Sequence, residues 1–162
     1  MPPADASHDR GPAVPFPPPI VYVLGFGLGA LLERWAPLPV RLPTHSWWAL
    51  NAGLGLMVVG LIVLYTGIMT FRRADTPVYP HSPARLVVSH GIYAHTRNPM
   101  YLGLATFYLG GVMATGMLWP LLLFPLVIFV VRTQVIAREE RHLTEKFGDD
   151  YRDYATRVRR WL

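Results

Sequence analysis

Two polar clusters flank one long uncharged stretch of the sequence. The first is GIYAHTRNPMYLG (residues 91–103), and the second is REER (residues 138–141). The first turn of a membrane helix explains Arg97 and Pro99, because proline is tolerated there and arginine favours the headgroup region. It does not explain Tyr93 and Tyr101. Since charges beside an apolar segment are costly unless they pair or bind a ligand, the clusters predict either a salt-bridged helix cap or a site for a small polar ligand.

The composition is typical of a membrane protein. Of the 162 residues, 52% are hydrophobic and 15% are charged, and the mean hydropathy is +0.28, which is too apolar for an ordinary soluble fold. No cysteine is present, which excludes disulfides, thiolate metal ligands and a cysteine nucleophile. The net charge of +5 comes from basic residues beside apolar spans, so we expect anionic membrane lipids rather than nucleic acid as partners.

The N-terminal part predicts a disordered tail followed by two membrane spans. Residues 1–19 are rich in proline and carry mixed charge, which is typical of a disordered segment. Ile20 to Leu32 predicts a short first span, and the uncharged stretch from Ser46 to Phe71 predicts a second. The glycines of GLGLMVVG (residues 53–60) have a spacing that is typical of packing surfaces between membrane helices.

The long uncharged stretch predicts a helical hairpin. Residues 100–131 are too many for one span and are interrupted near Gly116 and Pro120, where the residue types favour a turn. Each arm is short, so we expect the second arm to continue as a helix past Arg132 into the aqueous phase. The sequence therefore predicts an all-α integral membrane protein with about four transmembrane helices, of which residues 20–71 contribute the first part.

The distribution of lysine and arginine predicts the orientation of the chain. Arg34 and Arg41 are the 2 basic residues between the first and second spans, and the other 13 lie on the opposite side. Because cytoplasmic loops carry an excess of basic residues, we expect an inner (cytoplasmic) membrane protein with both termini in the cytoplasm. Both polar clusters then meet at the cytoplasmic rim of the hairpin.

The two clusters also resemble a known family signature. The string G-x-Y-x-x-x-R-N-P-x-Y-x-G (residues 91–103), followed after the hairpin by REERHLTEKFGDDYRDYATRVRRWL (residues 138–162), looks like the isoprenylcysteine carboxyl methyltransferase-like family, which resembles phospholipid methyltransferases. The resemblance covers about the last half of the chain. It implies that residues 72–162, including the hairpin 100–131, are a catalytic region with a cytoplasmic cofactor pocket. The family motifs Arg-His-Pro-x-Tyr-x-Gly and Glu-Glu-x-x-Leu are met by Arg97, Pro99, Tyr101, Gly103, Glu139, Glu140 and Leu143.

This resemblance implies S-adenosylmethionine as the methyl donor and a lipophilic acceptor that arrives from the bilayer. It places catalytic roles on Arg97, Asn98 and Glu139. The aromatic faces of Tyr93 and Tyr101 suit the adenine or the cationic sulfonium. The family's cofactor contacts fall on Leu86, Val87, Val88, Tyr93, Asn98, Pro99, Met100, Tyr101 and Glu139.

The two adjacent glutamates are expected to have different roles. Neighbouring residues of an α-helix point about 100° apart, so only one of the two side chains faces a given site. The family motif assigns the cofactor to Glu139. We therefore expect Glu140 to be structural or to pair with a basic neighbour.

Two positions depart from the family pattern. Asn98 stands where the family has histidine, so it keeps a hydrogen-bonding side chain but cannot shuttle a proton. Val135 stands where members that process prenylated cysteine place an arginine for the substrate carboxylate, and Arg132 is nearby but on another face. We assign Val135 and Arg132 to the substrate-binding region and expect an acceptor other than a prenylcysteine carboxylate.

Two other interpretations stay open. A membrane reductase of related helical arrangement would bind NADPH in place of the methyl donor. A non-catalytic membrane scaffold would use the polar clusters only to stabilise the hairpin and would bind neither cofactor. No metal is expected, because the histidines His81, His90, His95 and His142 do not have the spacing of metal ligands.

Overall fold

All regular structure in the described residues is helical. The computed structural model describes residues 12, 14–40, 46–74 and 86–162, and no strand occurs within these ranges. This agrees with the predicted all-α fold. The elements are α1 (Pro18–Trp35), α2 (Trp47–Arg73), a 3₁₀ helix η1 (Gly91–Ala94), α3 (Pro99–Thr115), α4 (Leu118–Val130), a π-helical segment η2 (Val131–Ile136), α5 (Ala137–Phe147) and α6 (Asp149–Arg157).

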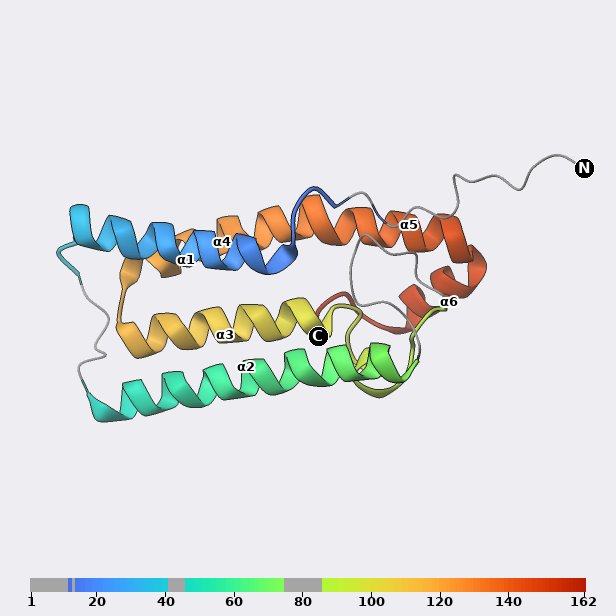
Figure 1. Cartoon of the computed structure of the whole chain (residues 1–162), viewed down its shortest axis with the longest axis horizontal. Helices are drawn as coiled ribbons and strands as arrows, with labels where there is room; N and C mark the ends of the chain where they lie inside the picture. The colour runs from blue at the N-terminus through green and yellow to red at the C-terminus, as the bar shows by residue number, and fades with distance from the viewer. Residues whose placement is uncertain (1–11, 13, 41–45, 75–85) are drawn as a thin grey trace, which may run out of the picture.

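The four long helices lie side by side in two pairs (Figure 1). Helix α1 packs against α4, and α2 packs against α3 along its length. Helix α5 continues the line of α4 beyond the ends of the other helices, and α6 folds back from it. The C-terminus therefore returns to the start of α3, at the end of the bundle where the two polar clusters lie.

Helices α2 and α3 approach closely because glycines line their contact. A Cβ added at Gly60 would lie 2.6 Å from the backbone nitrogen of Phe107 and 2.7 Å from the carbonyl oxygen of Gly103. Gly53 meets the backbone of Ala114 and Gly110 at similar distances. No side chain fits between these backbones, so the glycine spacing in α2 is a packing surface, as the sequence predicts.

The turn between α3 and α4 closes the predicted hairpin. Gly116 has φ +69° and its N–H bonds to the carbonyl of Val112 at 2.9 Å, so it ends α3 in the left-handed conformation that glycine adopts freely. Glu33 then caps α4, because its Oε2 accepts hydrogen bonds from the N–H groups of Leu118 (3.1 Å) and Trp119 (3.2 Å). A carboxylate is favourable at a helix N-terminus, where N–H groups have no partner within the helix.

The second arm of the hairpin continues past Arg132, as predicted. Helix α4, η2 and α5 form one continuous helix from Leu118 to Phe147. Within η2 the N–H of Ala137 bonds to the carbonyl of Arg132, five residues earlier. This π turn adds one residue to the helical turn.

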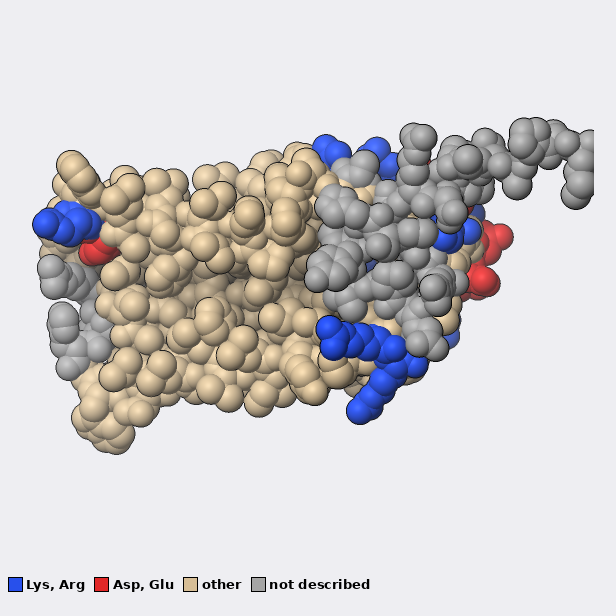
Figure 2. Space-filling model, in the orientation of Figure 1, with Lys and Arg blue, Asp and Glu red and all other residues tan. Residues whose placement is uncertain are grey.

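Within the described residues, two helices are long and apolar enough to cross a membrane. They are α2, with 27 residues, and the continuous helix Leu118–Phe147, with 30 residues. Helix α1 has 18 residues and α3 has 17. On the face drawn in Figure 2, charged side chains gather at the two ends of the molecule and are absent from the zone between them. Val23, Ile62 and Phe129 are more than half exposed, and exposed apolar surface of this kind is compatible with a membrane protein.

Most of the predicted tail, residues 1–19, lies outside the described residues. In the described part, Val14 is 2% exposed and Pro18 begins α1. Proline suits the first turn of a helix, where its missing N–H has no cost. Residues 14–19 therefore belong to the folded structure.

Replacing Gly60 by alanine is expected to destabilise the protein by about 1–3 kcal/mol, because the added methyl meets backbone atoms that cannot move aside. Gly55 is the matched control: it lies in the same helix, and a Cβ there meets nothing within 4 Å. Gly55→Ala is expected to be neutral or to stabilise α2 by about 0.5–1 kcal/mol. Thermal unfolding in detergent measures both, and equal stability of the two variants would contradict the close approach of α2 and α3.

Candidate functional site

The first polar cluster is positioned by η1 and by the start of α3. Gly91, at φ +62°, lies in the left-handed region that glycine adopts freely, and it admits the chain into η1. Oγ1 of Thr96 accepts a hydrogen bond of 3.3 Å from the backbone N–H of Asn98. Pro99 then starts α3. Arg97 and Asn98 are thereby fixed immediately before the helix.

Tyr101 and Glu139 bring the two clusters into contact. The hydroxyl of Tyr101 donates a hydrogen bond of 2.6 Å to Oε1 of Glu139. Tyr93 is 5% exposed, and its ring packs on Phe71 with the centroids 4.9 Å apart. Burial raises the pKa of the Tyr93 hydroxyl, and the nearby Tyr154 and Glu139 raise it further. Two protonated tyrosine hydroxyls, those of Tyr93 and Tyr101, therefore lie close to the carboxyl group of Glu139.

Glu140 points elsewhere and is held by two arginines. Arg160 donates from Nε to Oε1 of Glu140 at 3.0 Å and from Nη2 to Oε2. Nη1 of Arg97 lies 3.5 Å from Oε1 of Glu140. The hydrogen bond to Glu140 raises the pKa of the Arg160 guanidinium. Burial and then Glu140 raise the pKa of the adjoining Tyr151 to about 12, while Arg97 opposes this shift. Glu140 thus pairs with basic residues, as its place beside Glu139 indicates.

The C-terminal segment, residues 158–162, packs on the first cluster through its backbone. The N–H of Arg97 donates to the carbonyl of Arg159 at 2.9 Å. Both Asn98 Nδ2 (3.0 Å) and Thr96 Oγ1 (3.2 Å) donate to the carbonyl of Arg160. The side chain of Asn98 therefore holds the C-terminal segment in place.

Arg160 and Trp161 are site residues that the motifs do not predict. Arg160 contributes its guanidinium to Glu140 and its carbonyl to Asn98, and Trp161 packs against the apolar core. The one signal in the sequence is that Glu140 needs a basic partner, and any of several basic residues after position 140 satisfies that need. Contacts made by backbone carbonyls leave no signal in the residue types.

The other predicted cofactor contacts lie in different surroundings. Pro99 and Met100 face α2, where their Cγ atoms are 3.5 and 3.0 Å from the position that a Cβ would occupy at Gly67. The side chain of Met100 therefore packs toward α2. The stretch before η1 contains one exposed, one partly buried and one buried side chain, in the order Leu86, Val87 and Val88.

Val135 and Arg132, assigned to the substrate-binding region, differ in exposure. Val135 is fully buried at 0% exposure, whereas Arg132 is exposed. Both lie in the π segment η2. The buried position of Val135 therefore carries no cationic group of its own, and the guanidinium of Arg132 faces outward.

The residues brought together suit a ligand that carries both a positive and a negative group. Glu139 beside Tyr93 and Tyr101 offers a carboxylate and aromatic faces, which favour a cation. Nε of Arg97 is buried and has no hydrogen-bond partner among the described residues, and a ligand carboxylate would satisfy this donor. S-adenosylmethionine carries a sulfonium, an ammonium and a carboxylate, and this set of side chains fits it.

The fold and the site define a helical protein with membrane-length helices, in which the start of α3, the helix α5 and the C-terminal segment form one polar site. A family model described as phospholipid methyltransferase matches residues 48–150. This match covers more than half of the chain, so the chain belongs to the phospholipid methyltransferase family. Both polar clusters lie inside the matched range, and the C-terminal segment follows it.

Three relatives illustrate the family. A protein-S-isoprenylcysteine O-methyltransferase of Schizosaccharomyces pombe is 41% identical over 73 residues, which cover 45% of this chain and 31% of the relative. Protein-S-isoprenylcysteine O-methyltransferase A of Arabidopsis thaliana is 30% identical over 116 residues, which cover 70% of this chain and 59% of the relative. Methanethiol S-methyltransferase 1 of Bradyrhizobium diazoefficiens is 30% identical over 152 residues, which cover 85% of this chain and 51% of the relative. The chain thus spans less than two thirds of the length of these relatives.

Proposed function

We propose that the chain is a membrane methyltransferase that moves a methyl group from S-adenosylmethionine to a small lipophilic or amphiphilic acceptor. The observation that carries this proposal is the 2.6 Å hydrogen bond between Tyr101 and Glu139, which joins the two motif segments at one site. The family and its O- and S-methyltransferase members support the type of reaction.

The side chains of the site hold and orient the methyl donor. S-adenosylmethionine, when bound, supplies a methyl group on a positively charged sulfur. Glu139 and the aromatic faces of Tyr93 and Tyr101 attract the cationic part of the donor, and Arg97 donates to its carboxylate. Because methyl transfer is a direct displacement, these residues align the donor and exclude water. Asn98 acts as a positioning residue through its bond to the C-terminal segment.

The catalytic region, residues 72–162, lies at the cytoplasmic side of the inner membrane in this proposal. All four long helices cross the bilayer, and the helix from Leu118 leaves it near Arg132, the first charged residue after the uncharged stretch. The 2-against-13 split of basic residues supports this orientation. Membrane lipids then surround the exposed apolar side chains of α1 and α2.

The acceptor in this proposal is not a prenylcysteine carboxylate. A carboxylate in a site of low dielectric constant needs a charged partner, for which arginine is preferred. Val135 is fully buried and apolar, and Arg132 is exposed. A small amphiphile without a carboxylate meets these surroundings at lower cost, and methanethiol, for which one relative is named, also has no carboxylate.

Both termini are expected in the cytoplasm. A reporter that is active only in the periplasm is expected to be silent when fused after Leu162 and active when fused near Pro43, because the basic residues retain the C-terminal side inside. The reverse pattern would contradict the cytoplasmic location of the termini, and activity at both positions would contradict the four-span arrangement.

Substitutions of Glu139 and Glu140 are expected to have different effects, the first on binding of the methyl donor and the second on stability. Glu139→Gln removes a charge-assisted interaction with the donor, which contributes on the order of 1.5–3 kcal/mol, so the affinity for S-adenosylmethionine is expected to fall about ten- to a hundredfold. Glu140→Gln weakens the pairs with Arg160 and Arg97 and is expected to lower the melting temperature. Calorimetric titration and thermal unfolding of the purified variants measure the two effects.

If folded Glu139→Gln binds S-adenosylmethionine with the affinity of the wild type, the proposed role of Glu139 is wrong. Binding of NADPH instead of S-adenosylmethionine by the wild type would favour the reductase. Binding of neither by a folded protein would favour the scaffold.

Methyl transfer to a short farnesylated cysteine is expected to be weak in the wild type and to rise in Val135→Arg, which supplies the missing guanidinium. The rate of transfer from a labelled methyl donor is measured in the wild type, in Val135→Arg and in Arg132→Ala. Efficient wild-type transfer that disappears in Arg132→Ala would show that Arg132 binds the carboxylate. If Val135→Arg does not fold, the wild-type rate still decides, because efficient transfer contradicts the proposed acceptor class.

A further inference from the structure

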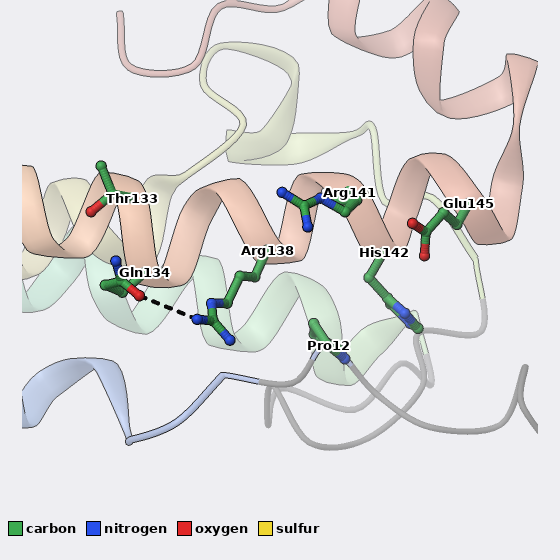
Figure 3. Close-up of a pocket in the computed structure, with 7 residues that line it drawn as sticks. All are labelled: Pro12, Thr133, Gln134, Arg138, Arg141, His142 and Glu145. Atoms are coloured by element: carbon green, nitrogen blue, oxygen red, sulfur yellow. Dashed lines mark hydrogen bonds between the residues drawn. The ribbon is translucent and has the colours of Figure 1, made fainter.

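A polar pocket lies along η2 and α5, and neither Tyr101 nor Glu139 is among its lining residues. Its volume is about 590 Å³, which is within the range of small-molecule sites. Figure 3 shows that Arg138 and His142, one helical turn apart, point toward Pro12 from the same side of α5. The described residues that line it are Pro12, Thr133, Gln134, Arg138, Arg141, His142 and Glu145.

The lining is rich in hydrogen-bond donors. Two guanidinium groups, from Arg138 and Arg141, line the pocket together with one carboxylate, that of Glu145. Arg138 donates from Nη2 to Oε1 of Gln134 at 3.2 Å, which leaves the amide NH₂ of Gln134 as a further donor. Nε2 of His142 is buried and has no hydrogen-bond partner among the described residues. An unsatisfied buried nitrogen beside two guanidinium groups favours an anion with several acceptor oxygens.

The pocket is separate from the site of Glu139. Gln134, Arg138, Arg141 and Glu145 follow each other at steps of four, three and four residues, so they share one face of the helix. Glu139 points from another face toward α3, where Tyr101 holds it. Neither Tyr101 nor Glu139 lines the pocket.

The position along the helix indicates what kind of anion arrives there. Residues 100–131 carry no charge, and the pocket begins at Thr133, just beyond this stretch. In the proposed membrane arrangement this is the level of the lipid headgroups, where basic residues meet lipid phosphates. A phosphate offers the acceptor oxygens that a guanidinium fork and an imidazole N–H bind.

We propose that this pocket binds a phosphate group, distinct from the methyl donor and the methyl acceptor. The phosphate belongs either to an anionic phospholipid headgroup or to a free phosphate ion, and the chemistry of recognition is the same for both. Arg138 and Arg141 supply the charge, and His142 supplies the N–H that fixes the orientation. The carboxylate of Glu145 offsets part of this charge, and the two guanidinium groups leave the lining with a net positive charge.

Spin-labelled phosphatidylglycerol, compared with spin-labelled phosphatidylcholine around the full chain in bilayers, tests the lipid source. The wild type is expected to prefer phosphatidylglycerol, and Arg138→Gln/Arg141→Gln is expected to lose this preference by on the order of tenfold. Arg157→Gln and Arg152→Gln, combined, remove the same formal charge from exposed sites on α6 and are expected to keep it. His142→Phe is expected to weaken the preference although it leaves the formal charge unchanged.

Calorimetric titration of the detergent-solubilised protein with inorganic phosphate tests the second source. Phosphate binding that is lost in Arg138→Gln/Arg141→Gln supports a phosphate site filled from solution, whether or not the lipid preference is present. An equal loss of lipid preference in the α6 double variant would overturn the proposal, because it would reflect general surface charge. Absence of both lipid preference and phosphate binding in the folded wild type would overturn it as well.

Discussion

The carboxylate of Glu140 ties together three segments that are far apart in the sequence. It lies on α5 and pairs with Arg97 before α3 and with Arg160 in the C-terminal segment. The Arg97 and Glu140 side chains are only 15% and 17% exposed, so water screens this pair less than an ion pair at the surface. Removing one partner leaves a largely buried charge uncompensated, which costs more than the pair itself contributes. The placement of Arg97 and Asn98, and hence of the polar site, depends on this carboxylate.

The π turn in η2 decides which glutamate meets which partner. The N–H of Ala137 bonds five residues back to Arg132, and the added residue rotates all later positions by about 100° relative to an uninterrupted α-helix. Without this turn, a neighbour of Glu139 would face Tyr101. The turn therefore allows α4 to keep its apolar contacts with α1 while α5 presents Glu139 to Tyr101 and Glu140 to Arg160.

Local patterns in the sequence predict the helices but only part of the site. The uncharged runs predict α2 and the hairpin, because the length and apolar character of a helix can be read from one stretch of sequence. Gly116 predicts the turn of the hairpin, because glycine adopts the left-handed backbone conformation freely. The meeting of Tyr101 with Glu139 also follows, since both ends of a hairpin lie on one side. Motif spacing does not determine which way each side chain points, and it does not predict that Met100 packs toward α2. The role of the C-terminal segment is not predictable in this way, because it binds Asn98 through a backbone carbonyl.

The short string REER places opposite charges on different faces of one helix. Glu139 points inward to Tyr101, whereas Arg138 and Arg141 line the pocket on the outer side. If the two glutamates lay on the outer face, anionic headgroups would repel them. If the two arginines lay on the inner face, they would lie beside the site proposed to bind a cation. Because adjacent residues differ by about 100° in direction, four consecutive residues are enough to avoid both conflicts. In the proposed membrane arrangement, this helix therefore carries basic residues toward the headgroups and an acidic site toward the bundle within a single turn.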